Sequence, residues 1–183
     1  MEQLIKFLNG KRVYLRPIEN SDLDLFYANA LWDKEVRRLT GTQTVFSRQV
    51  LENWFERNST DDSRIDLMIC LQENNQPIGD LAMIDINHLN QNSVIRISLF
   101  DKAYWGNGYG TEALELLLDF GFNILNQHRI GLDVFAYNER AIKAYEKLGF
   151  KQEGRVRDEL FYNGAFHDSI IMGILKAEYQ KGC

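Results

Sequence analysis

Three glycines within five residues mark the segment whose composition could do chemistry. They stand in Trp105–Ala113 (WGNGYGTEA), between a strand pattern and a long helix pattern. Glycines let neighbouring backbone N–H groups converge on one point without interference from Cβ atoms, and the first turn of a helix adds N–H groups that lack partners. We call residues 105–111 the glycine loop. It predicts a binding site for an anion such as a phosphate.

Two common phosphate-binding loops fit this segment less well. Gly108, Gly110 and Ala113 match a relaxed dinucleotide fingerprint, and Asp133 ends a later strand pattern. That acid lies 25 residues beyond Gly108, however, and meandering strands precede the loop in place of repeated βαβ units. A Walker A loop is excluded because no Gly-Lys-Ser/Thr follows.

Asn138 and Tyr145 belong to a second pattern, N-x-x-A-x-x-x-Y, at helical spacing. Asn138 can cap a helix over Glu139–Leu148, and Tyr145 lies seven residues further along, two turns later on about the same face. A tyrosine on an apolar stripe is by itself more often a core residue than a catalyst. The residues alone leave both roles open.

Apolar patterns predict the elements that must position these residues. Strands are expected over Lys11–Ile18, Ile65–Leu71, Ile78–His88, Val94–Phe100, Arg129–Phe135, Phe150–Phe161 and Phe166–Leu175. Helices are expected over Leu23–Leu31, Ser47–Arg57, Gly110–Leu125 and Glu139–Leu148. Turn signals between neighbouring strands, Asn163-Gly164 above all, imply antiparallel pairs. The order predicts a mixed α/β fold around one sheet.

Composition limits the class of protein. The 183 residues fit one domain (1–183), and 21 Lys and Arg against 26 Asp and Glu leave a net charge of −5, which argues against nucleic-acid binding. We expect a cytoplasmic protein, since no signal peptide and no apolar run of about 18 residues that could cross a membrane is present. Cys70 and Cys183 support neither a disulfide framework nor a usual zinc site, and both are expected to be inert.

The glycine loop, a strand and then N-x-x-A-x-x-x-Y-x-x-x-G-F resemble the GNAT superfamily of acetyl-CoA-dependent N-acetyltransferases. The chain looks most like the branch that holds ribosomal-protein N-terminal alanine/serine acetyltransferases and spermidine acetyltransferases, in which Trp105 is a tolerated exchange for Arg or Gln. The resemblance runs from the first strand to Leu175–Tyr179. It implies a largely antiparallel sheet of about seven strands, flanked by helices and splayed between the fourth and fifth strands. It also implies acetyl-CoA as co-substrate, no metal and a homodimer.

The resemblance also implies roles for individual residues. Amides of the glycine loop would hold the CoA pyrophosphate, and the strand end Ser98-Leu99-Phe100 would pair with pantetheine. An N–H near Leu99 would stabilise the oxyanion, Asn138 would contact CoA, and Tyr145 would protonate the thiolate. The implied CoA-binding set is Ser98, Leu99, Phe100, Trp105, Gly106, Asn107, Gly108, Tyr109, Gly110, Thr111, Asn138 and Tyr145.

The general base is the open point, because Ile95 stands where many members of this branch carry a glutamate. Asp85 interrupts an apolar run and is expected to face the substrate pocket; His88 titrates near neutrality; a chain of water molecules would serve equally well. Arg96 shares a strand face with Ser98. It is expected either to orient an acidic substrate group or to pair with Asp85.

Two acceptor classes follow from the resemblance. Asp85-Ile86-Asn87-His88 is similar to the Glu-Ile-Asn-His stretch of spermidine acetyltransferases, and a net charge of −5 suits a polyamine. Arg37–Thr42 (RRLTGT) stands in place of the acidic cluster that those enzymes carry, which favours a protein N-terminus, such as that of a ribosomal protein, or another small primary amine. A third hypothesis is a GNAT module that binds acyl-CoA without turnover; Ile95 favours it, and Tyr145 and Asn138 oppose it.

Overall fold

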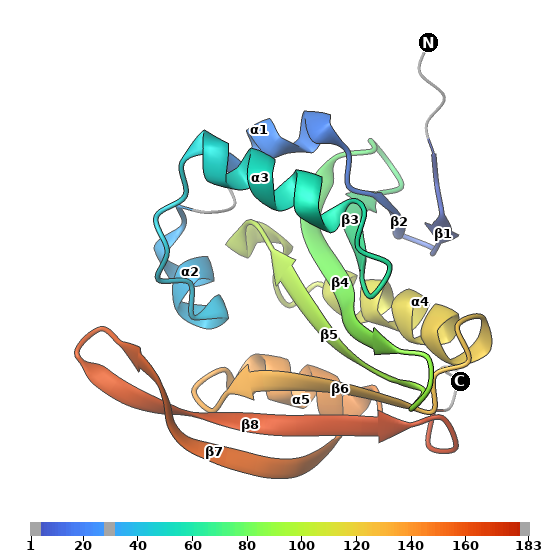
Figure 1. The fold of residues 1–183 in the computed structure, drawn as a ribbon, viewed down its shortest axis with the longest axis vertical. Helices are drawn as coiled ribbons and strands as arrows, with labels where there is room; N and C mark the ends of the chain where they lie inside the picture. Colours follow the sequence, from blue (N-terminus) through green and yellow to red (C-terminus); the bar gives the residue numbers. More distant parts are fainter. Residues whose placement is uncertain (1–4, 28–31, 180–183) are drawn as a thin grey trace.

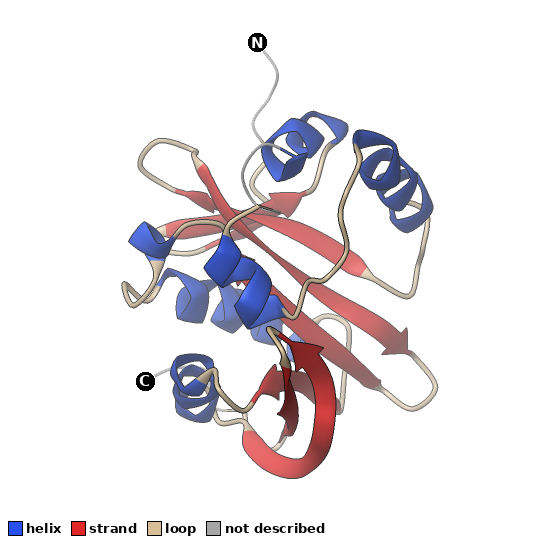
Figure 2. Ribbon diagram, turned by 90° about the vertical axis from the view of Figure 1, so that its left-hand side faces the viewer, coloured by secondary structure: helices blue, strands red, loops and turns tan. Residues whose placement is uncertain are grey.

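A computed structural model describes residues 5–27 and 32–179, which form one eight-stranded sheet with helices on both sides (Figures 1 and 2). The spatial order of the strands is β1-β2-β3-β4-β5-β6-β8-β7. Their bounds are β1 Leu8–Asn9, β2 Val13–Pro17, β3 Ile65–Leu71, β4 Pro77–Asn87, β5 Asn92–Leu99, β6 Arg129–Phe135, β7 Lys151–Tyr162 and β8 Ala165–Leu175. The predicted mixed α/β fold is confirmed, with the short β1 as an additional strand at one edge.

The helices lie between these strands in the expected order. They are α1 Leu23–Leu25, α2 Lys34–Thr40, α3 Arg48–Asn58, α4 Tyr109–Asn123 and α5 Glu139–Lys147, with 3-10 turns at Asn20–Asp22 and Lys102–Tyr104. The helix expected over Leu23–Leu31 is described only in its first part, because residues 28–31 lie outside the described ranges. Cys183 also lies outside them, whereas Cys70 is buried.

The sheet splays apart between β5 and β6, as expected. These two strands pair in parallel, whereas the other neighbours are antiparallel. Their register consists of three pairs, of which Val94↔Gly131 is the last. The segment of β5 from Ile95 to Leu99 is therefore paired only with β4, and its other flank is open toward β6.

Two core clusters lie on opposite sides of the sheet, because successive side chains of a strand point to opposite faces. The larger cluster includes the apolar stripe of α4 and residues of six strands, among them Val13, Ile69, Leu81, Ile95, Leu114, Leu117, Leu118, Phe122, Ile130 and Met172. The smaller cluster joins Tyr14, Met68, Cys70 and Phe100 to Leu23, Phe26 and Leu51. We call these the α4 side and the α3 side of the sheet.

Helix α2 was not predicted from the sequence. Asp33 caps it by accepting hydrogen bonds from the N–H groups of Glu35 and Val36, and Gly41 ends it in the left-handed region at φ 66°. Val36 is its one buried residue. A seven-residue helix with a single buried side chain shows no apolar stripe, so the periodicity on which a sequence-based prediction depends is missing.

Candidate active site

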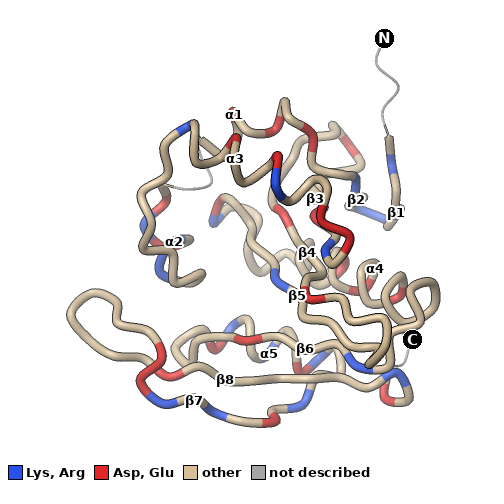
Figure 3. The backbone as a smooth tube through the Cα atoms, viewed as in Figure 1, with Lys and Arg blue, Asp and Glu red and all other residues tan. Residues whose placement is uncertain are grey.

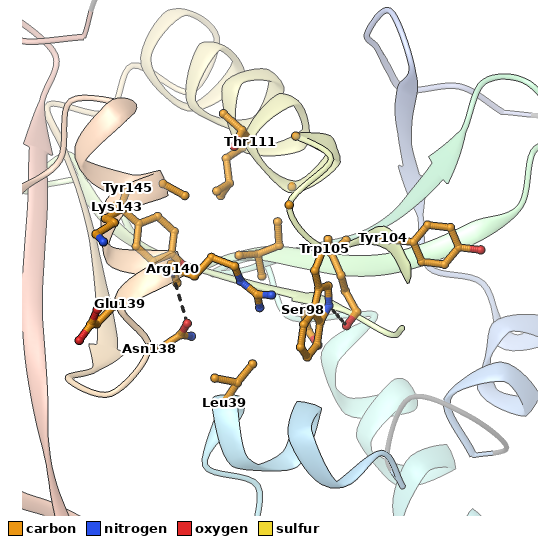
Figure 4. A pocket seen from close by; sticks show the side chains of 18 of the residues that line it. Leu39, Ser98, Tyr104, Trp105, Thr111, Asn138, Glu139, Arg140, Lys143 and Tyr145 are labelled. Carbon is orange, nitrogen blue, oxygen red and sulfur yellow. Dashed lines mark hydrogen bonds between the residues drawn. The ribbon is translucent and has the colours of Figure 1, made fainter. Parts of the chain in front are cut away.

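A cavity of about 720 Å³ lies between the splayed end of β5 and helix α5 (Figure 4). Residues of α2, β5, the glycine loop, α4 and α5 line it. Leu39 of α2 and Thr111 of α4 lie at opposite ends of the cavity (Figure 4). The cavity therefore extends from the glycine loop and α4 to α2.

The glycine loop requires glycine at two positions. Gly106 has a φ of 73° and Gly108 a φ of 83°, in the left-handed region that L side chains rarely adopt. Gly108 is also the N-cap of α4, so the unpaired N–H groups of the first turn of this helix follow it directly. These backbone groups lie where the sequence predicts an anion site.

Arg12 of the β1–β2 turn contacts both the glycine loop and helix α4. Its Nη1 donates a 2.7 Å hydrogen bond to the carbonyl of Asn107, and its Nε lies 3.0 Å from Oε2 of Glu112 on α4. Oε1 of Glu112 accepts from the backbone N–H of Arg12 at 2.7 Å. Burial alone would raise the pKa of Glu112, but these hydrogen bonds from Arg12 hold it below its usual value. Strand β2 and helix α4 thus fix the position of the loop.

Cationic side chains of α5 line the same cavity as the glycine loop. Arg140, Lys143 and Lys147 all line it, and the Arg140 guanidinium lies 4.1 Å from the ring centroid of Trp105. Trp105 in turn donates from Nε1 to the Leu99 carbonyl at 3.3 Å. Sequence reasoning missed these cations, although their spacing of three and four residues places them on one helix face. They suit a ligand that carries several phosphates.

Tyr145 and Asn138 belong to the same wall. The Tyr145 side chain lines the cavity but the residue is only 8% exposed, and burial raises the pKa of its phenol to about 12. Asn138 is the N-cap of α5, and its Oδ1 accepts from the N–H of Ala141 at 3.3 Å. Within residues 5–27 and 32–179 its amide nitrogen has no hydrogen-bond acceptor, so two donors are available to a ligand. The two residues thus place a proton donor and an amide donor on one side of the cavity.

Comparison with known proteins places the chain in a family. Residues 12–151 match the Acetyltransferase (GNAT) domain. The chain belongs to the GNAT acetyltransferase family. This acetyltransferase is 30% identical over 168 residues to the spermidine N(1)-acetyltransferase of Escherichia coli K12, covering 91% of this chain and 88% of that protein. It is 32% identical over 102 residues to a putative ribosomal N-acetyltransferase of Bacillus subtilis, covering 56% of this chain and 55% of that protein.

The fold of this acetyltransferase also matches solved structures. The crystal structure of spermidine N-acetyltransferase from Vibrio cholerae in complex with CoA and spermine superposes with a TM-score of 0.85. Sequence identity is 26%, over 92% of this chain and 98% of that one. The co-substrate of this enzyme is acetyl-CoA, and the multiply phosphorylated ligand suited to the cavity is CoA. In the described ranges, no three His, Cys, Asp or Glu side chains gather as a metal site would need, and no helix is long and apolar enough to span a membrane.

Most of the CoA-binding residues expected from the resemblance line the cavity of the acetyltransferase. Those that do are Ser98, Leu99, Trp105, Gly106, Gly108, Gly110, Thr111, Asn138 and Tyr145. Phe100 does not: it is buried on the α3 side with its ring 5.4 Å from that of Phe26. Asn107 and Tyr109 turn toward Ala103 and Arg12, respectively, and support the loop.

The expectation that Asp85 faces the substrate pocket was wrong. Asp85 lies at an irregularity in β4, where the register with β5 shifts between Ile84 and Asn87, and it has a φ of 51°. The side chain is exposed and does not line the cavity, because the shifted register at this point turns a residue that interrupts an apolar run toward solvent. His88 is likewise exposed, in the turn after β4, and outside the cavity.

Arg96 pairs with other carboxylates than the expected Asp85. Its Nη1 lies 2.6 Å from Oδ2 of Asp80, and its Nη2 lies 3.1 Å from Oδ1 of Asp66. Ile95, where many relatives of this branch carry a glutamate, is buried in the core on the α4 side. None of the carboxylates expected from the sequence thus reaches the cavity as a general base.

Proposed function

We propose that this enzyme transfers the acetyl group of acetyl-CoA directly to a primary amine in the cytoplasm. The observation that carries the proposal is that one cavity joins the glycine loop, the splayed end of β5 and Tyr145. Amides of Gly106–Thr111 bind the pyrophosphate, and Asn138 and the cations of α5 contact the rest of CoA. Holding both reactants in one cavity removes most of the entropic cost of their encounter.

The reaction itself needs little from the protein. The uncharged amine attacks the thioester carbon, so an N–C bond forms while the carbonyl oxygen becomes an oxyanion that an N–H near Leu99 stabilises. The C–S bond then breaks, and Tyr145 gives its proton to the thiolate. The nitrogen loses its proton through water in the cavity, and the phenolate recovers one from solvent.

For the acceptor, we propose the N-terminal amine of a protein or another small primary amine. Arg37 and Arg38 belong to α2, at the end of the cavity away from the glycine loop, and Arg38 stacks on Tyr137 at 4.8 Å. Lys and Arg are interspersed with Asp and Glu along the chain (Figure 3), so the net charge of −5 forms no field directed at a polycation. A polyamine is the second candidate, because relatives that cover nine-tenths of the chain are named spermidine acetyltransferases.

The test is an acetylation screen with acetyl-CoA over polyamines, amino acids, aminoglycosides and N-terminal peptides, read out as released thiol. We expect turnover with peptides or small amines. Product from polyamines alone would overturn the proposed acceptor. Absence of thiol release with every acceptor, while acetyl-CoA still binds, would instead support the non-catalytic module. A homodimer remains a prediction, which the molar mass in solution tests.

A further inference from the structure

Four charged side chains form a chain across the α3 side of the sheet. Arg64 donates to both oxygens of Asp66, at 2.6 and 2.8 Å; Arg96 donates to Asp66 at 3.1 Å and to Asp80 at 2.6 Å. Two arginines and two aspartates sum to zero charge, so this ion-pair chain is complete without a ligand. Charge pairing does not explain, however, why the aspartates of this chain are buried while Arg96 is partly exposed.

The carboxylates of the chain point inward and one guanidinium points outward. The side chains of Asp66 and Asp80 are 11% and 6% exposed, whereas that of Arg96 is 40% exposed. Two buried carboxylates thus fix the orientation of one partly accessible cation. A guanidinium carries five N–H donors, and among the described residues these two hydrogen bonds occupy one donor on each Nη atom. Three donors remain for another partner.

Arg96 lies on β5, the strand that forms one wall of the cavity, without lining the cavity itself. Ile95, Ile97 and Leu99 pack toward α4, so Arg96 and Ser98 point to the other side of β5. The last β5–β6 pair is at Val94, two residues earlier, so the flank of Arg96 toward β6 is unpaired. Ser98 lines the cavity, and the two positions are about 7 Å apart along the strand. The glycine loop lies on the α4 side of the sheet, which leaves the α3 side, where Arg96 lies, to the acceptor.

We propose that Arg96 is a specificity-determining residue that binds a carboxylate of the acceptor, so that the enzyme acetylates amines carrying a carboxylate near the reacting nitrogen. The proposal rests on the proposed acetyl transfer in this cavity. A planar guanidinium fork matches the geometry of a carboxylate, and its fixed orientation removes much of the entropic cost of binding. Free amino acids and peptides with an acidic residue at the N-terminus both carry a carboxylate near the reacting amine. The experiment tests the two classes separately.

The test pairs each acceptor with its own carboxamide: an amino acid with its amide, and an acidic N-terminal peptide with the corresponding Gln or Asn peptide. We expect wild-type kcat/KM to favour the carboxylate form of at least one pair by tenfold or more. In Arg96→Gln this preference disappears, chiefly through KM of the acid, while KM of acetyl-CoA stays within threefold. Arg96→Lys keeps the charge without the fork and restores only part of the preference.

Two further variants guard against a folding defect. Arg96→Gln leaves the buried carboxylate of Asp80 unpaired, whereas Arg96→Gln/Asp80→Asn removes both charges together and should fold while still lacking the preference. Arg48→Gln removes an arginine that pairs with Asp24 at the surface, and it should keep the preference.

Equal use of acid and amide by the wild type, a preference that survives in the double variant, or turnover of polyamines alone would each overturn the role of Arg96 and leave the acetyltransferase assignment intact. Absence of turnover with any acceptor would overturn the proposed function, and the role of Arg96 with it.

Discussion

The phenol of Tyr145 is an acid whose pKa burial raises further above the neutral range. Desolvation raises its pKa to about 12, so it stays protonated throughout the neutral range and is available as the acid for the CoA thiolate. We expect Tyr145→Phe to lower kcat about 100-fold with little change in KM of acetyl-CoA, which steady-state thiol release will measure. An unchanged kcat would contradict the acid role.

The pH dependence of Tyr145 follows from the sign of its pKa shift. A tyrosine in the unfolded chain ionises near pH 10, and burial moves this pKa upward, so the acid form would be lost only as the pH rises toward 12. Below pH 9, kcat/KM of the wild type should therefore rise with pH as the acceptor amine deprotonates, and the midpoint should be the same in Tyr145→Phe. An alkaline fall below pH 9 that Tyr145→Phe removes would show that the phenol ionises in this range.

The turn into α4 depends on the backbone conformation of Gly108. At φ 83° an alanine is strained, and its Cβ would lie 2.9 Å from Nη2 of Arg12. We expect Gly108→Ala to raise KM of acetyl-CoA at least tenfold and to cost about 1 kcal/mol of stability. Gly164→Ala is the matched control, because Gly164 has a φ of 81° with nothing within 4 Å of a Cβ. It should lose similar stability and keep its KM; an equal KM in both variants would argue against the loop as the CoA site.

The contact between β2 and α4 through Glu112 should give a pH signature. Hydrogen bonds from Arg12 lower the pKa of this carboxyl from its usual 4.5, so the ionised form stabilises the fold above pH 4.5, and this contribution is lost as the pH falls through the lower, folded-state value. Glu112→Gln should therefore have a lower Tm than the wild type at pH 7, and the difference should shrink below pH 4.5. Thermal unfolding between pH 3 and 7 measures it. A constant difference would contradict the ionic role of Glu112.

The two halves of the sheet meet through three β5–β6 register pairs, and the CoA cavity lies where they diverge. A ligand that binds this cavity only in the folded state stabilises both halves together. Acetyl-CoA at 100 times its Kd should raise the free energy of unfolding by about 2.7 kcal/mol. That corresponds to roughly 5–10 °C in Tm for a chain of this size. NAD at the same concentration should cause no shift; a shift with NAD alone would favour the dinucleotide reading of the glycine loop.

Local patterns predicted β3 and β6 with the bounds that the structure has, and the helices α3, α4 and α5 within about two residues at each end. They failed where a segment deviates from its period. Asp85 was expected in the pocket because it interrupts an apolar run, and the irregularity in β4 turns it to solvent. Helix α2 was not predicted, because only one of its residues is buried and its sequence therefore shows no apolar period.

The sequence by itself determined the glycine loop, the capped helix with Tyr145 and the family, because glycine conformations, caps and helical periods are properties of neighbouring residues. Only the tertiary structure decided what surrounds them. Arg12 and Glu112 are 100 residues apart, and Arg96 and Asp66 are 30 apart. Their contacts depend on strand register and on how α4 packs on the sheet, which are set by the burial of the whole core and not by any single segment.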